Sequence, residues 1–313
     1  MATERQEQSQ LTPLVSVVLP TFNRLRFLRA TVASVFAQTF TDWELVVADD
    51  GSDEETRQYL RELARDPRVT ILWLEHSGIP AIVRNSALHA ARGDYIAFID
   101  SDDLWTSEKL TRQLATLRAR PNCEWCYTAF AQVDASDVLL PEETHRLWVP
   151  HQGAIFEQMA LGKVSIRTPS VLAKRHLIEK VGGFDETISS AEDYDLWLRL
   201  ALESELALVN EPLIQVRRHD ENHSRAWESA FTGRDRALHK LLGRVADDRR
   251  SLLKKERVKN ALKQAATHAS LGDSPNTLRA LRHSLPYSWS YPQWWLAALK
   301  TLVKPHLTSR LHP

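Results

Sequence analysis

The segment YIAFIDSDD, Tyr95 to Asp103, joins an apolar run to a cluster of acidic residues. A short apolar run of this kind is typical of a strand that is buried on both faces of a sheet. The acidic residues begin where the apolar run ends, at Asp100. The segment therefore predicts a central strand that delivers several carboxylates to one edge of a sheet.

Three earlier segments repeat this arrangement. Short apolar runs at 15–19, 44–48 and 69–74 each precede a helical pattern, as the run at 95–99 does. Alternating strands and helices predict an α/β fold, with a mostly parallel sheet and helices on both faces. Ligands bind such sheets at the carboxyl ends of the strands. The polar residues expected at that edge are Thr21, Asn23, Asp49, Asp50, Asp100, Asp102 and Asp103.

The 313 residues have the composition of a soluble globular protein, with 43% hydrophobic and 26% charged residues. Their zero formal net charge hides an asymmetry: residues 1–230 carry a net charge of −11 and residues 231–313 a net charge of +11. We expect a disordered lead-in over residues 1–13, a main domain over 14–230 and a basic helical C-terminal region over 231–313.

The chain shows no signal for secretion or for membrane insertion. Residues 1–10 lack an apolar core, and no stretch approaches the ~20 apolar residues of a membrane-spanning helix. We therefore expect a cytoplasmic protein, either free or peripheral on the inner face of the cell membrane. Near its end the chain gathers aromatic residues and lysines, which suit a membrane interface or a packed helical subdomain equally well: Tyr287, Trp289, Tyr291, Trp294, Trp295, Lys300 and Lys304.

Two acidic motifs are candidates for ligand binding. Asp100 and Asp102 provide hard oxygen ligands that suit Mg²⁺ or Mn²⁺ together with substrate phosphates, although such residues also cap helices. Asp49 and Asp50 are able to accept hydrogen bonds from a ribose or a base, although Asp-Asp-Gly-Ser is also ordinary β-turn sequence. The sequence leaves both alternatives open.

Taken in order, the motifs resemble family 2 glycosyltransferases of the bacterial type. The resemblance covers about residues 14–225, and the segments that carry it are VVLPTFN at 17–23, ADDGS at 48–52, Arg84-Asn85, DSDD at 100–103, GGFDE at 182–186 and EDYDLW at 192–197. It implies a GT-A fold and an inverting transfer from a nucleotide-diphosphate sugar. A UDP-sugar is the expected donor, and a glycan or lipid-linked hydroxyl is the expected acceptor.

The resemblance also assigns donor-binding roles by position. Thr21, Phe22 and Asn23 would lie near the nucleotide, with Phe22 facing the base. Asp50 would contact the base or ribose, with Asp49 beside it and Arg84 near the donor. The remaining donor-site acids would be Asp100, Asp102, Asp103 and Glu192, with Asp102 the expected metal ligand.

An inverting transfer is a single displacement, so it needs a base on the far side of the anomeric carbon. Asp193 matches the position of that base in the family, although a carboxylate at a helix N-terminus is also stabilised by the helix dipole alone. Asp195 and Arg199, which lie four residues apart, are expected to form a pair on the helix surface.

His219 follows a run of polar and basic residues, Gln215 to Arg218. In many members of the family a histidine at a similar point closes over the donor and is able to ligate the metal, and a neutral imidazole suits Mn²⁺. A lone histidine in a loop is as often exposed to solvent, so both interpretations stand. We expect Mn²⁺ or Mg²⁺ as the cofactor.

Two other functions share parts of this pattern. A sugar-phosphate nucleotidyltransferase would carry a glycine-rich loop after the first strand, and Pro20-Thr21-Phe22-Asn23 stands there instead. A non-catalytic nucleotide-sugar binding protein would not need Asp193. Nucleic-acid binding by the basic region is not expected.

Overall fold

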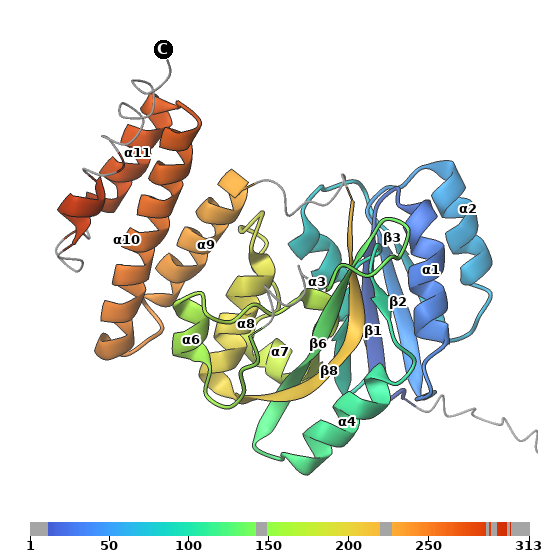
Figure 1. The fold of residues 1–313 in the computed structure, drawn as a ribbon. Helices are drawn as coiled ribbons and strands as arrows, with labels where there is room; N and C mark the ends of the chain where they lie inside the picture. The colour runs from blue at the N-terminus through green and yellow to red at the C-terminus, as the bar shows by residue number, and fades with distance from the viewer. Residues whose placement is uncertain are drawn as a thin grey trace, which may run out of the picture.

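The computed structural model describes residues 12–141, 149–219, 227–285, 288, 293–298 and 301. Within this part of the chain, eight strands form one sheet in the order β3-β2-β1-β4-β7-β6-β8-β5. Helices lie on both sides of the sheet, and helices α9 to α11 lie beyond α8 on one side (Figure 1). The lead-in expected over residues 1–13 falls almost wholly outside the described residues.

The strands are β1 Val15–Thr21, β2 Trp43–Asp49, β3 Val69–Trp73, β4 Tyr95–Phe98, β5 Leu104–Trp105, β6 Cys123–Asp134, β7 Leu172–Lys174 and β8 Glu205–Arg218. The helices that cover the sheet are α1 Leu25–Phe36, α2 Glu54–Leu63, α3 Pro80–Ala90, α4 Lys109–Ala119, α6 Phe156–Ala160, α7 Arg175–Val181 and α8 Glu192–Glu203. The C-terminal helices are α9 Trp227–Leu241, α10 Asp247–Ser270 and α11 Ser274–Ser284, and a 3-10 turn spans Thr168–Ser170.

The four strands predicted from the sequence form the parallel half of the sheet. Strand β1 pairs in parallel with β2 and β4, and β2 pairs in parallel with β3. The register places Thr21 opposite Asp49, so these two strands end side by side. The predicted α/β architecture is therefore confirmed, and the polar residues that follow these strands share one edge.

The other half of the sheet is mixed, and the sequence did not predict strands β5 and β8 within it. Strand β7 is antiparallel to β4 and β6, β8 is parallel to β6, and β5 is antiparallel to β8. The register between β6 and β8 shifts on both sides of Ala129. Because such irregularities interrupt the alternation of side chains, these strands show no clean period-two pattern in the sequence.

Apolar side chains fill two cores, one on each face of the sheet. On one face, Leu28 of α1 and Leu114 of α4 belong to one core, to which β1 and β2 add alternate residues and β6 and β8 add Phe130 and Ile214. On the other face, α3, α7 and α8 bury residues such as Ala87, Ile178 and Trp197. Helix α9 adds Leu238 to this second core. The first C-terminal helix therefore packs on the same core as the sheet.

Helices α10 and α11 form a third apolar cluster with Trp294, whose indole nitrogen donates to Ser284 Oγ over 2.8 Å. Trp294 is buried, whereas 66% of Trp295 is exposed. The other members of the predicted aromatic and lysine group lie outside the described residues: Tyr287, Trp289, Tyr291, Lys300 and Lys304. Among the described helices, none is long and apolar enough to cross a membrane.

A buried polar network fixes the starts of β1, β2 and β4 relative to one another. Ser16 Oγ donates to Glu44 Oε1 over 2.6 Å and accepts from the Gly93 amide over 2.8 Å. The amide of Arg92 donates to the same Glu44 oxygen over 2.7 Å. A Cβ added to Gly93 would stand 2.6 Å from the Ser16 nitrogen, which no backbone contact tolerates.

We therefore expect Gly93→Ala to destabilise the protein, because β1 or the turn before β4 must move to admit the methyl group. The expected loss is about 1–3 kcal/mol in the free energy of unfolding, seen as a lower melting temperature. Gly243→Ala is the matched control, since no atom lies within 4 Å of its added Cβ. Equal melting temperatures for the two variants would contradict this account.

Candidate active site

The carboxyl ends of β1, β2 and β4 carry the polar residues predicted for the site. The Asp50 amide donates to the Thr21 carbonyl over 2.9 Å, which extends the pairing of β1 and β2 past their ends. Thr21 is buried, and its hydroxyl has no hydrogen-bond partner among the described residues. A buried hydroxyl of this kind is suited to bind an incoming ligand.

The carboxylate of Asp50 holds the loop that follows β3. It accepts from the amide and hydroxyl of Ser77 over 2.8 and 2.9 Å and from the Gly78 amide over 2.9 Å. In the same loop, the ring of His76 stacks on Phe22, with 4.1 Å between centroids and 20° between planes. Phe22 is 38% exposed, so this aromatic pair offers a partly open face next to Asp50.

Asp49 and Asn23 shape the turns at this edge. Asp49 is fully buried and accepts from the Ser52 amide over 3.2 Å, in agreement with the β-turn role that the sequence left open. Asn23 has a φ of 53° and accepts from the Asp53 amide over 2.6 Å. Its own amide donates to Ser52 Oγ over 2.9 Å. Both residues therefore fix the turns that carry Phe22 and Asp50.

Asp102 faces two basic side chains. Its Oδ2 atom accepts from Arg24 and lies 3.0 Å from Nε2 of His219. His219 comes directly after β8, is buried and stacks on Phe27 with 4.6 Å between centroids. The alternative of a solvent-exposed loop histidine is therefore wrong. Strand β8 brings His219 back to the acidic cluster from 117 positions away.

Asp103 has a different environment from Asp102. Its Oδ1 atom accepts from the Arg217 amide over 2.9 Å, and it is buried. Burial and then the charges of Asp102 and Asp100 raise the pKa of Asp103 well above its ordinary value. Of the two adjacent acids, Asp102 faces the histidine, whereas Asp103 bonds to the backbone of β8.

Arg84 joins two parts of the site. Its Nη2 atom donates to Asp100 Oδ1 over 2.7 Å, and its Nη1 atom donates to Glu192 Oε1 over 2.6 Å. Burial alone would lower the pKa of Arg84, but the two carboxylates outweigh it and raise that pKa. The guanidinium thus ties the loop after β4 to the first residue of α8.

Asp193 lies next in α8 and is partly buried. Its Oδ2 atom accepts from Thr168 Oγ1 over 3.2 Å, and its Oδ1 atom accepts from the Tyr194 amide over 2.6 Å. Burial and then the neighbouring charge of Glu192 raise the pKa of Asp193 to about 6. A carboxylate with such a pKa is suited to take a proton near neutral pH.

The residues around Asp102 fit a divalent cation held by few protein ligands. A carboxylate oxygen and an imidazole nitrogen converge there, and this donor set suits Mn²⁺. Ions of this class take their other ligands from water and substrate phosphates. The described residues hold no group of three or more acidic, histidine or cysteine side chains placed to bind a metal. A diphosphate would therefore have to complete the site.

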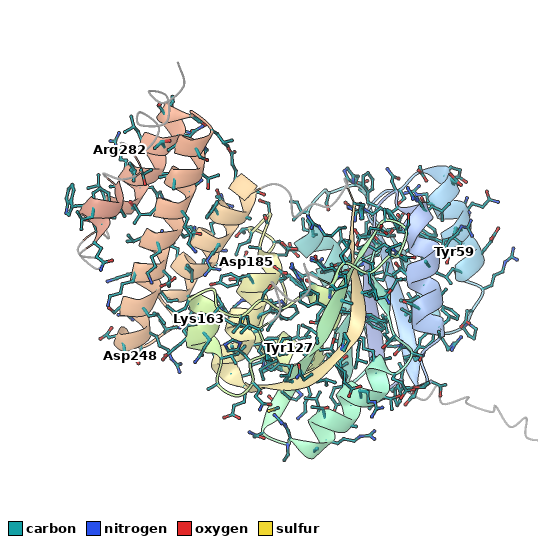
Figure 2. The ribbon with its side chains drawn as sticks, viewed as in Figure 1. Tyr59, Tyr127, Lys163, Asp185, Asp248 and Arg282 are labelled. Carbon is teal, nitrogen blue, oxygen red and sulfur yellow. The ribbon has the colours of Figure 1, made fainter. Side chains whose placement is uncertain are left out.

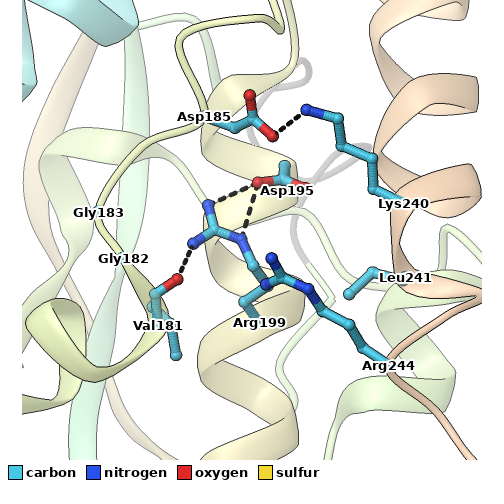
Figure 3. A pocket seen from close by; sticks show the side chains of 9 residues that line it. All are labelled: Val181, Gly182, Gly183, Asp185, Asp195, Arg199, Lys240, Leu241 and Arg244. Carbon is cyan, nitrogen blue, oxygen red and sulfur yellow. Dashed lines mark hydrogen bonds and ion pairs between the residues drawn. The ribbon is translucent and has the colours of Figure 1, made fainter.

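Sequence reasoning missed three residues of the site and misplaced one pair. Arg24, Thr168 and Arg217 contact Asp102 or Asp193, yet no motif marks them. The expected surface pair, Asp195 and Arg199, is buried instead, and Arg199 also donates to the Val181 carbonyl over 2.7 Å (Figure 3). The end of α7 covers this pair, which the spacing within α8 could not reveal.

Comparisons with known proteins agree with these features. The model of glycosyl transferase family 2 matches residues 16–174. The putative teichuronic acid biosynthesis glycosyltransferase TuaG of Bacillus subtilis is 38% identical over 38% of this chain, which spans 47% of TuaG. The Escherichia coli UDP-Glc:alpha-D-GlcNAc-diphosphoundecaprenol beta-1,3-glucosyltransferase WfgD is 30% identical over 63% of this chain and 73% of its own length.

Solved structures share the fold. Staphylococcus aureus TarS 1–349, in complex with UDP-GlcNAc, superposes with a TM-score of 0.70 over 95% of this chain and 91% of its own, at 16% identity. The mannosyltransferase PcManGT of Pyrobaculum calidifontis, in complex with GDP-Man and Mn²⁺, has a TM-score of 0.60 at 19% identity, over 94% of this chain and 88% of its own. The expected GT-A fold is confirmed.

The position of Arg84 generates a stability prediction. In Arg84→Met, Asp100 and Glu192 would face each other without a cation, at an expected cost of about 3–5 kcal/mol at pH 8. The melting temperature, set beside that of the wild type, measures this loss.

Arg61→Met is the control, since Arg61 pairs with Glu54 on the exposed surface of α2. Its effect should stay within about 0.5 kcal/mol. A loss for Arg84→Met that is as small as this would count against the bridge.

Proposed function

Because the chain belongs to glycosyl transferase family 2, we propose that it moves a sugar from a UDP-sugar to an acceptor hydroxyl with inversion at the anomeric carbon. One observation carries this proposal. Arg84 contacts both Asp100 and Glu192, so the helix that bears Asp193 begins at the edge where β4 ends. The candidate catalytic base, Asp193, and the candidate diphosphate site after β4 thus belong to one site.

The donor would lie across the ends of β1, β2 and β4. The nucleobase of the donor would pack on Phe22, beside Asp50. The hydroxyl of Thr21, which has no hydrogen-bond partner among the described residues, would donate to the nucleotide. A uridine donor is supported by the UDP-sugar named for the relative WfgD and by the UDP-GlcNAc in TarS. A thermal-shift screen of UDP-, GDP- and dTDP-sugars identifies the donor before any kinetic work.

The reaction would be a single displacement. Asp193 takes the proton of the acceptor hydroxyl while the oxygen forms a bond to the anomeric carbon. The bond from that carbon to the diphosphate breaks, and the diphosphate leaves with the electron pair. Asp102 and His219 would hold a divalent cation that neutralises the leaving group's charge. Arg24, which contacts Asp102, adds a second positive charge at that point.

The proposed acceptor is a lipid-linked glycan intermediate of cell-surface polysaccharide synthesis, at the inner face of the cell membrane. The names of TuaG and WfgD support this assignment. The C-terminal region supports it too, since it exposes large apolar side chains of the kind that enter a membrane interface: Leu271, Leu278, Leu285, Trp295 and Leu296. The net charge of +11 in residues 231–313 suits anionic lipids.

Replacing the base tests the chemistry. Asp193→Asn should lower kcat for transfer by about 10²–10⁴-fold and leave the Kd for UDP within about twofold of wild type. The variant should also be folded, because ionising Asp193 above its raised pKa costs the native state free energy that asparagine does not. Its melting temperature at pH 8 should equal or exceed that of the wild type.

Asp248→Asn serves as the control, since Asp248 is an exposed residue of the C-terminal helices (Figure 2). A nucleotide-sugar binding protein without catalysis would release no UDP from a bound donor in either variant or in the wild type. Full turnover by Asp193→Asn would remove Asp193 from the mechanism.

The pKa of Asp193 predicts the pH dependence of turnover. Since the carboxylate must be ionised to accept a proton, kcat/KM should rise with pH and level off above an apparent pKa of about 6. A stopped assay of UDP release from pH 4.5 to 8.5 measures the profile. An acid limb near pH 4, the ordinary range of an aspartate, would show that burial does not tune this group.

The metal ligands generate a separate prediction. Chelation with EDTA should abolish transfer, and His219→Ala should raise the Mn²⁺ concentration that restores half the activity by about 10–100-fold. His283→Ala is the control, because His283 is exposed on α11. Equal Mn²⁺ requirements for the wild type and His219→Ala would exclude the histidine as a ligand.

A further inference from the structure

Helix α9 contacts the segment that leads into α8. Arg236 Nη1 donates to the Thr187 carbonyl over 2.8 Å. Lys240 donates to the carboxylate of Asp185 and, over 2.6 Å, to the hydroxyl of Thr187. Asp185 lies between the sheet and the C-terminal helices (Figure 2), and Figure 3 shows Lys240 reaching toward it from α9. Residues 185–187 are thus bound by two side chains of α9.

Gly233 brings the backbone of α9 directly against this segment. A Cβ added at Gly233 would stand 1.6 Å from the Ser190 carbonyl oxygen and 2.7 Å from its carbon. Both of these are backbone atoms, so no side-chain rotation relieves the overlap. Only glycine at position 233 lets α9 approach residue 190 this closely.

The residue that follows Ser190 has an unusual backbone. Ala191 is the N-cap of α8 and has a φ of 65°, in the left-handed region that is unfavourable for a residue with a Cβ. Its carbonyl accepts from the Asp195 amide over 3.1 Å, which is the first backbone hydrogen bond of α8. Such a conformation persists only where its surroundings impose it. The close contact between Gly233 and Ser190 is one such constraint on Ala191, which lies two residues before Asp193.

Helix α9 also contacts Tyr194, the residue that follows Asp193. The guanidinium of Arg234 lies 4.5 Å from the centroid of the Tyr194 ring. The same group donates to the Ala160 carbonyl over 2.8 Å. The hydroxyl of Tyr194 in turn donates to the Met159 carbonyl over 3.3 Å. Arg234 therefore fixes the side chain that follows Asp193 in the chain.

The next helix holds α9 in place. Arg257 of α10 donates to both carboxylate oxygens of Asp235 over 2.8 Å, and Arg257 is buried. Asn260 donates to the Phe231 carbonyl over 2.8 Å. A continuous set of contacts therefore runs from α10 through α9 to the first turn of α8.

We propose that α9 is part of the catalytic apparatus and that Gly233 is a positioning residue, which sets the N-terminus of α8 and hence the place of the Asp193 carboxylate. This inference rests on the proposed role of Asp193 as the base. On this account the first helix of the basic C-terminal region serves turnover through the position of Asp193, besides any contact that the region makes with a membrane.

Gly233→Ala tests the proposal in the full-length chain. The methyl group should displace the segment at Ser190, so kcat should fall at least tenfold while the Kd for UDP stays within about twofold. Amide hydrogen exchange over residues 191–196 should become faster, because the first backbone hydrogen bond of α8, from Asp195 to Ala191, is weakened. Gly243→Ala, with no atom within 4 Å of its added Cβ, should leave kcat, the Kd for UDP and the amide exchange unchanged.

Arg236→Gln covers the case in which Gly233→Ala does not fold. It removes one contact with the Thr187 carbonyl and should lower kcat by a smaller factor, again with UDP binding intact. A kcat equal to wild type in whichever variants fold would overturn the proposal. So would a parallel fall of kcat and UDP binding in both variants, since that pattern indicates general unfolding. If Asp193→Asn is itself fully active, the proposed role of Asp193 as the base fails first, independently of the contacts of α9.

Discussion

The site depends on one buried guanidinium. Arg84 has an acidic partner on each side, Asp100 at the end of β4 and Glu192 at the start of α8, 108 positions further along the chain than Arg84. Two carboxylates this close would repel each other strongly in a water-poor environment. The positive charge of Arg84 offsets that repulsion. Its hydrogen bonds to both carboxylates join the loop after β4 to the start of α8, the helix that carries Asp193.

The same link sets the electrostatics of the neighbouring groups. Glu192 is paired with Arg84 and precedes Asp193, and burial and then the charge of Glu192 raise the pKa of Asp193 to about 6. Asp102 is paired with Arg24 and lies within 3.0 Å of His219. The two carboxylates therefore have different environments and are suited to different tasks, one to proton transfer and the other to charge neutralisation.

The sequence predicted the parallel half of the sheet because β1, β2 and β4 are short apolar runs that end in polar residues. It did not predict β8, whose pairing with β6 is irregular, although β8 positions both Arg217 and His219. For the same reason, the sequence could not distinguish the roles of Asp102 and Asp103. Adjacent residues point in different directions, and only the register of a strand over 100 positions away fixes which of them faces the histidine.

A structure of the protein with an unhydrolysed UDP-sugar and Mn²⁺ is the most direct test of the account. It should show the anomeric carbon between Asp102 and Asp193, with the diphosphate on the Asp102 side and the Asp193 carboxylate facing the opposite side of the sugar. A donor bound elsewhere, or one whose diphosphate lies between the sugar and Asp193, would contradict the account.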